Sequence, residues 1–211
     1  DEACAEDNII VKWELEDLNT SFINSRKMSV RSIVSFLFTA EDVYDEETAV
    51  AVEGAEEAQY INKNIDITQI AINKKDTYRI KDEVNLPSNK PNMFEILYNE
   101  ASLRNVDIRL QEDKISLKGE AVLFILYTSE DEENPIQYHE TDISFGGMID
   151  CNGAHENMIS DIDISIQSKD LEIKPDSDGE ERVIDVEMIL MMGIKAYQEE
   201  ELEILCDVYS T

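Results

Sequence analysis

The side chains best suited to nucleophilic or metal chemistry are few: two histidines, His139 and His155, and three cysteines, Cys4, Cys151 and Cys206. Nucleophilic catalysis needs a Ser or Cys beside a His that a carboxylate orients. Cys151 and His155 lie close in sequence and form the candidate dyad. The cysteines lie far apart with no CxxC pair, so we expect reduced thiols that behave as small apolar residues.

Four acidic residues surround Gly179 in the run DSDGEE and could offer oxygen ligands to calcium: Asp176, Asp178, Glu180 and Glu181. The run is too short for an EF-hand loop and lacks its distal bidentate Glu. We therefore expect a solvated hairpin tip, with a calcium site as the alternative. The phosphate-cradling patterns GxGxxG and GxxxxGKS/T are both absent. The sequence thus predicts no cofactor and no enzyme activity.

The chain is strongly acidic, with 48 Asp and Glu against 18 Lys and Arg in 211 residues and a net charge of -30. Binding to nucleic acid or to an anionic membrane needs clustered Lys and Arg, so these partners are not expected. No run reaches the ~18 apolar residues of a membrane-spanning helix. Acidic runs at 44–47, 129–133 and 197–203 follow predicted strands. They either protect sheet edges from indiscriminate pairing or dock a basic partner protein.

The apolar residues recur mostly with a period of two, which is typical of strands in antiparallel sheets. Short strands with polar turns and no alternating helices predict an all-β fold of the sandwich or barrel kind. One short helix is expected at 91–99, where Pro91 suits the first turn and Phe94, Leu97 and Tyr98 share a helical face. The predicted strands are 9–15, 27–39, 59–72, 76–84, 103–110, 113–127, 135–144, 158–167, 182–196 and 200–209.

The chain also resembles itself. Residues 25–40 and 180–196 match in pattern when Val30 is laid on Val186, and upstream Trp13 then pairs with Ile164. We infer a duplicated, tandem unit. Residues 1–58 would form the C-terminal half of a first repeat, 59–80 a linking strand, and 81–211 a complete repeat.

Three segments carry a resemblance to a known family: LPSNKPNMFEIL (86–97), DKISLKGEAVLFILY (113–127) and NPIQYHETDISFGGMID (134–150). Together they resemble the SPOCS domain of clostridial, SipL-like spore-coat assembly proteins, and INSRKMSVR (23–31) resembles the end of a preceding repeat. The family's LysM domain has no counterpart in this sequence. The resemblance implies a non-catalytic scaffold that acts in the mother cell, at the forespore surface or in the spore coat.

The partners that the resemblance implies are proteins, namely a spore-coat ATPase or other coat proteins, and self-association stays open. Binding energy at such interfaces comes from a few aromatic anchors. Tyr127, Tyr138 and Phe145 flank the most family-like segment and are the candidate anchors, although each also suits a core position. Two other classes remain open. One is a secreted or surface carbohydrate-binding or surface-layer module, and the other is an enzyme with a deep cleft.

Overall fold

The computed structural model describes residues 8–54 and 58–210, and over these residues the chain is built from strands without a helix. This confirms the all-β fold class. The eight strands are β1 (Asn8–Asn24), β2 (Lys27–Glu41), β3 (Ala58–Asn85), β4 (Met93–Gln111), β5 (Lys114–Ser129), β6 (Ile136–Asp150), β7 (Ile159–Pro175) and β8 (Glu181–Ser210).

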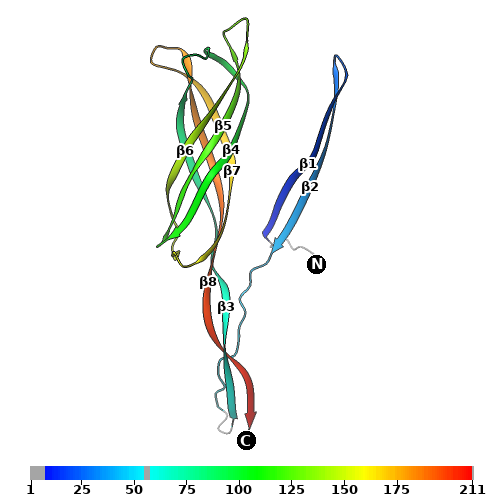
Figure 1. Cartoon of the computed structure of the whole chain (residues 1–211). Helices are drawn as coiled ribbons and strands as arrows, with labels where there is room; N and C mark the ends of the chain where they lie inside the picture. Colours follow the sequence, from blue (N-terminus) through cyan, green and yellow to red (C-terminus); the bar gives the residue numbers. More distant parts are fainter. Residues whose placement is uncertain (1–7, 55–57, 211) are drawn as a thin grey trace. The chain divides into compact units, whose positions relative to one another are not determined.

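The chain divides into two compact units. Unit 1 comprises Asp1–Ile61 with Asp207–Thr211, and unit 2 comprises Asn62–Cys206. Unit 1 contains the antiparallel β1–β2 hairpin, drawn in blue in Figure 1. The repeat boundaries at 58 and 80 stay a prediction, because compactness alone does not define a repeat.

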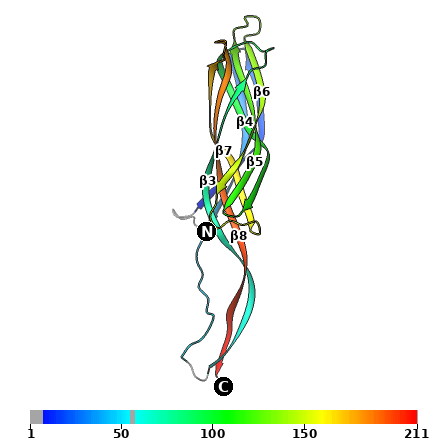
Figure 2. The same ribbon diagram turned by 90° about the vertical axis from the view of Figure 1, so that its left-hand side faces the viewer.

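Unit 2 is a sandwich of two three-stranded sheets, ordered β3-β8-β7 and β4-β5-β6. The pairs β4–β5, β5–β6 and β7–β8 are antiparallel. Figures 1 and 2 show the two layers and also show β3 and β8 running on past them as a twisted ribbon. Each sheet thus has one central strand, β8 in the first and β5 in the second.

The core lies between these two central strands. In β5 every second residue from Ala121 to Tyr127 is fully buried, and in β8 the same holds from Ile184 to Ala196. This follows from the alternation of side chains across a strand, since one face of each sheet meets the other sheet. Burying an aliphatic side chain of this size contributes about 1.5–3 kcal/mol. The strands predicted from period-two patterning therefore form the sandwich.

The short helix expected at 91–99 is wrong, because strand β4 begins at Met93. Met93 is buried, and Tyr98 pairs with Leu126 of β5. Two irregularities in register, between Met93 and Glu95 and between Ile96 and Tyr98, break the simple alternation that marks a strand in sequence. The spacing of apolar residues then imitates a helical face, and pairing with β5 overrides it.

Side chains close both edges of the sandwich. On one edge, Tyr78 of β3 donates a hydrogen bond to the backbone oxygen of Gly146 in β6 (2.8 Å), and Lys74 donates to that of Asp150 (2.7 Å). On the other edge, Lys169 of β7 donates to the backbone oxygen of Asn99 in β4 (2.8 Å). The two sheets are therefore joined at their margins as well as through the core.

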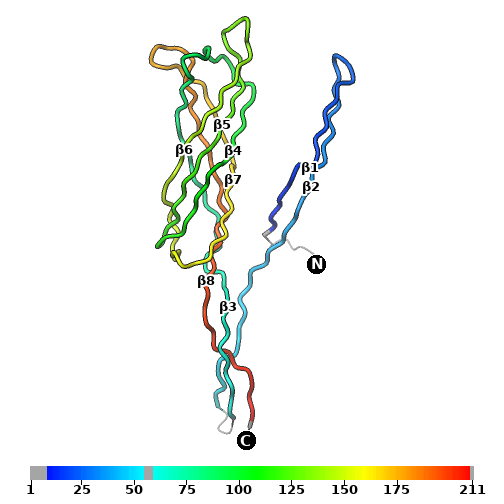
Figure 3. Tube along the Cα trace, in the orientation of Figure 1, coloured from blue at the N-terminus to red at the C-terminus, as the bar shows by residue number. Residues whose placement is uncertain are grey.

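Three connections gather at one end of the sandwich, as the tube in Figure 3 shows: 86–92, 130–135 and 176–180. Arg182 holds the first of them, because its guanidinium donates to the backbone oxygens of Lys90 (2.9 Å) and Pro87 (2.8 Å) and to Asn92 Oδ1 (2.8 Å). The backbone of Leu86 in turn donates to that of Arg182 (2.8 Å). The 86–92 connection is thus held in place by the Arg182 side chain.

Candidate interaction surface

A row of aromatic rings crosses the outer face of the β4-β5-β6 sheet. It arises because β5 alternates, so that Phe124 and Leu126 point away from the core that Leu123 and Ile125 enter. Leu126 pairs with Tyr98 on one side and with Tyr138 on the other. The ring centroids of Tyr98 and Phe124 lie 6.4 Å apart, and those of Phe124 and Tyr138 lie 6.0 Å apart in a stacked arrangement. We call Tyr98, Phe124, Leu126 and Tyr138 the aromatic ladder.

The ladder is open to solvent and has charged groups at its rim. The side chains of Tyr98 and Tyr138 are 52% and 57% exposed. The Tyr98 hydroxyl donates to the carboxylate of Glu100 (3.2 Å), which raises the pKa of Tyr98. The Lys90 ammonium lies 4.6 Å from the centre of the Tyr138 ring, a cation–π contact. The ladder therefore offers apolar ring faces with both a cation and an anion beside them.

Farther along the same face the sheet is polar. Arg104 of β4 bridges the carboxylates of Asp142 in β6 (2.9 Å) and Glu120 in β5 (3.4 Å). Exposed ion pairs of this kind add little to stability. They do mark where the apolar surface ends, so the ladder is a bounded patch.

Of the three predicted anchors, the structure presents one. Tyr138 belongs to the ladder, whereas Tyr127 and Phe145 are buried between the sheets. Tyr127 reaches the backbone oxygen of Pro91 (3.4 Å) from inside, and burial raises the pKa of its hydroxyl. Tyr98 and Phe124 were missed in the sequence. The alternation of β5 predicts that Phe124 points outward. Tyr98 could have been placed beside it only if 93–103 had been predicted as a strand instead of a helix.

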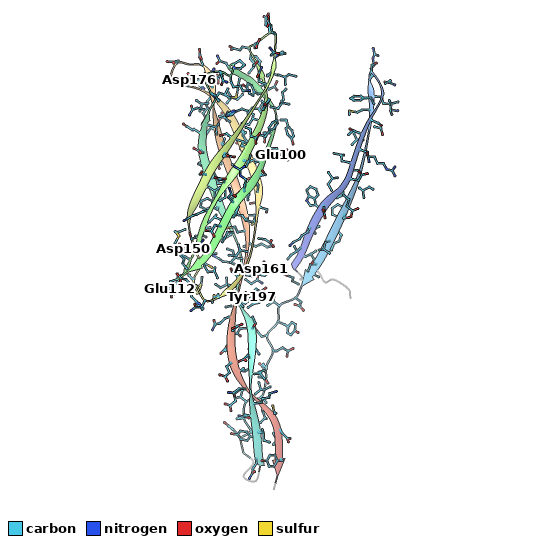
Figure 4. The ribbon with its side chains drawn as sticks, viewed as in Figure 1. Glu100, Glu112, Asp150, Asp161, Asp176 and Tyr197 are labelled. Carbon is cyan, nitrogen blue, oxygen red and sulfur yellow. The ribbon has the colours of Figure 1, made fainter. Side chains whose placement is uncertain are left out.

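The acidic residues considered for calcium form the β7–β8 turn. The Asp176 carboxylate accepts hydrogen bonds from the backbone amides of Asp178 (2.9 Å) and Glu180 (3.0 Å), and Gly179 takes a positive φ of 84°. These bonds are those of a turn that an Asp side chain stabilises. Figure 4 labels Asp176 at one end of the sandwich of unit 2, with Glu112 and Asp150 at the other end of the sandwich. Across residues 8–54 and 58–210, no group of three or more His, Cys, Asp or Glu is arranged to hold a metal.

The residues considered for nucleophilic chemistry lie at the end of the sandwich opposite that turn. Cys151 is buried, and desolvation raises the pKa of its thiol, which disfavours the reactive thiolate. His155 instead lines an open hollow of about 410 Å³ with Tyr197 and Glu199. Cys206 is an exposed free thiol, and Cys4 lies outside the described residues.

In the part of the chain that the structure describes, no helix is long and apolar enough to cross a membrane.

The comparison with protein families matches the sheet that carries the ladder. Residues 92–174 match the family model described as SipL, SPOCS domain. This range runs from the start of β4 to the end of β7 and so includes the whole β4-β5-β6 sheet. No curated protein and no solved structure matches the chain. The matched domain is associated with sporulation. Residues 92–174 of the chain are therefore similar to the SPOCS domain of SipL.

Proposed function

We propose that this chain is a non-catalytic protein-interaction module of spore-envelope assembly, and that the aromatic ladder is its docking surface. The observation that carries the proposal is the row of neighbouring rings Tyr98, Phe124 and Tyr138 on an outer sheet face. Aromatic residues dominate binding energy at protein interfaces, especially at the centre of the patch. The SPOCS match to the same sheet supports a role in sporulation.

The ladder is suited to binding because it is already ordered. Its rings are carried on paired strands and each lies beside the next, so little side-chain freedom remains to be lost on association. Tyr98 and Tyr138 are exposed to solvent and combine an apolar ring with a polar hydroxyl, a combination that is common at protein interfaces. A partner with an apolar centre would therefore dock without rearrangement of the sheet.

The charge of the chain indicates what surrounds that apolar centre on the partner. The net charge is -30, and Glu100 and Glu140 pair with Phe124 across the sheet. A basic rim on the partner would complement these carboxylates and accelerate association at low ionic strength. A spore-coat ATPase or another coat protein in the mother cell is the partner class that the family suggests.

A binding measurement with matched variants tests the proposal. The purified chain and its Tyr138→Ser variant are titrated with the spore-coat ATPase from the same genome at low and high salt, and Kd is measured by calorimetry. We expect Tyr138→Ser to weaken binding about fivefold or more, because loss of an aromatic anchor costs over about 1 kcal/mol. Tyr44→Ser, which alters an exposed tyrosine of unit 1, serves as the control and should leave Kd unchanged.

Two results would contradict the proposal. One is binding that Tyr138→Ser and Tyr44→Ser leave equally strong, which would put the docking surface elsewhere. The other is glycan binding that disappears with Tyr138→Ser while no coat protein binds. That result would favour the carbohydrate-binding alternative, since a row of aromatic rings can also stack on flat ligands.

A further inference from the structure

One face of the β1–β2 hairpin is apolar and open. Among its residues, Trp13 is 69%, Phe22 is 86% and Phe38 is 68% exposed. Strand pairing puts them on the same side, because Trp13 pairs with Phe36, Phe22 with Met28 and Val11 with Phe38. We call this set the hairpin face: Val11, Trp13, Leu15, Phe22, Met28, Val30, Val34, Phe36 and Phe38. A two-stranded ribbon alone is marginally stable in water, so such a face needs a cover.

The β1–β2 hairpin has the same register as the β7–β8 hairpin of unit 2. Leu15 pairs with Val34, and Ile166 pairs with Leu190 at the corresponding place. Directly after each pair comes a register shift, between Leu15 and Asp17 in one hairpin and between Ile166 and Ser168 in the other. A bulge inserts one residue at a defined position and is a specific feature of a strand pair. Its recurrence at the same point makes the two hairpins equivalent residue by residue.

This equivalence shows what covers such a face. The counterparts of Val30 and Phe38 are Val186 and Ile194 of β8, reached by the same offset in register. Val30 is 60% exposed, whereas Val186 is fully buried. The β4-β5-β6 sheet makes that difference, because its inner residues Leu117, Leu123 and Ile125 are buried in the same core as Val186. The hairpin face is thus the inner face of a sandwich that has only one of its layers.

We propose that the hairpin face binds a three-stranded antiparallel sheet of the β4-β5-β6 kind, carried by the same polypeptide on the N-terminal side of β1. In unit 2 the covering sheet precedes its hairpin and connects to it through the short segment 151–158. The same order puts the missing layer ahead of β1. Its inner side would carry alternating aliphatic and aromatic residues and no charge, as the core of unit 2 does.

Two other occupants fit less well. A second copy of the chain has its β4-β5-β6 inner face already buried against its own β8, so it could supply that sheet only by unfolding unit 2. A second hairpin could pack face to face with the first, but it offers two strands where the equivalent face in unit 2 meets three. The covalently linked sheet also needs no loss of translational freedom to bind.

Trp13 gives a direct test, because it is the single tryptophan of the chain and lies on the hairpin face. The chain is produced as it stands and also with its natural coding sequence extended upstream, any added tryptophan being replaced by phenylalanine. Fluorescence emission and acrylamide quenching of Trp13 are compared. We expect the extended protein to show blue-shifted emission and a several-fold lower quenching constant than the chain alone.

Two variants of the extended protein act as a matched pair. Phe36→Asp puts a charge on the hairpin face opposite Trp13 and should return quenching toward the level of the chain alone. Leu37→Asp alters the next residue, which points to the other side and is also exposed, and should leave Trp13 protected. Unit 2 supplies an internal reference in both proteins, since its core does not involve these residues.

Several outcomes would overturn the proposal. One is a Trp13 that stays as quenchable in the extended protein as in the chain alone, and another is a gene that encodes no strands upstream of β1. Protection of Trp13 in the chain alone would also overturn it. If that protection rose with concentration, a second copy would be the occupant, and if it did not, another part of this chain would be.

Discussion

The hydroxyl of Tyr78 in β3 donates a 2.8 Å hydrogen bond to the backbone oxygen of Gly146 in β6, linking the margins of the two sheets of unit 2. The ring of Tyr78 also lies 6.1 Å from that of Phe145, measured between centroids. A backbone oxygen that points outward from an edge strand has no partner in its own sheet. The Tyr78 hydroxyl therefore supplies a hydrogen-bond donor to the edge of the β4-β5-β6 sheet and joins the two sheets there.

Replacing Tyr78 with Phe should remove this bond and leave the ring contact. We expect the free energy of unfolding to fall by about 1 kcal/mol, the usual net worth of such a bond. Urea denaturation followed by circular dichroism measures it. Tyr44→Phe, in an exposed part of unit 1, should change nothing. An equal loss in both variants would show that the bond from Tyr78 to Gly146 contributes no stability.

A side chain at Gly119 should destabilise unit 2. A β-carbon there would lie 2.6 Å from Cζ of the Phe145 ring, which covers the glycine and is itself buried. We expect Gly119→Ala to lower the free energy of unfolding by roughly 1–3 kcal/mol through overpacking. Gly193→Ala is the control, because a β-carbon at that position meets nothing within 4 Å. Thermal unfolding distinguishes the two.

A second substitution checks the cause of the Gly119→Ala effect. The double variant Gly119→Ala, Phe145→Leu has no ring over the new β-carbon. Its loss in free energy of unfolding should therefore be smaller than the sum of the losses of the two single variants. A fully additive result would mean that the strain does not come from Phe145.

Arg182→Lys should loosen the 86–92 connection. The guanidinium donates to three acceptors at once, and an ammonium on a flexible stem cannot reproduce that fork. We expect a loss of about 2 kcal/mol in unfolding free energy, since hydrogen bonds from charged donors are worth roughly 1.5–3 kcal/mol. Hydrogen exchange of the Leu86 amide, which bonds to the backbone of Arg182, should accelerate. Unchanged exchange at Leu86 would contradict this account.

His139 should make the stability of unit 2 depend on pH. Burial, and to a smaller extent the charge of Lys90, lowers the pKa of His139 in the folded chain. Below about pH 6.5 the unfolded chain then binds a proton that the folded chain refuses, so the free energy of unfolding falls as the pH drops. Unfolding at about pH 7.5 and 5.5 should show a smaller drop for His139→Gln than for the unaltered chain. Equal drops would count against this role.

The strands could be predicted from the sequence because most of them alternate without interruption. β5 and β8 show it best, since alternate residues enter the core along most of β5 and from Ile184 to Ala196 of β8. β4 was predicted as partly helical because its two register shifts near Met93 and Ile96 disrupt the period of two. The local sequence pattern identifies a strand only where its pairing is regular. The bulges of β4 arise from its pairing with β5, which is a separate segment of the chain.

The aromatic ladder could not be predicted for a related reason. Tyr98, Phe124 and Tyr138 come from three strands, and their proximity depends on pairing registers that the sequence does not state. Tyr127 and Tyr138 have similar surroundings in the sequence, yet one is buried and the other is on the surface. A tyrosine is buried if it lies on the side of its strand that faces the other sheet. Which side faces the other sheet is decided only when the sandwich assembles.

The place of β8 in unit 2 has a consequence for biosynthesis. It is the central strand of its sheet and also the last of this unit to leave the ribosome. Until its 30 residues emerge, β3 and β7 lack the neighbour that joins them, and the nascent β4-β5-β6 sheet keeps its apolar side uncovered. At about 5–20 residues per second, that interval lasts a few seconds, during which the uncovered apolar side of the sheet can bind a chaperone or aggregate.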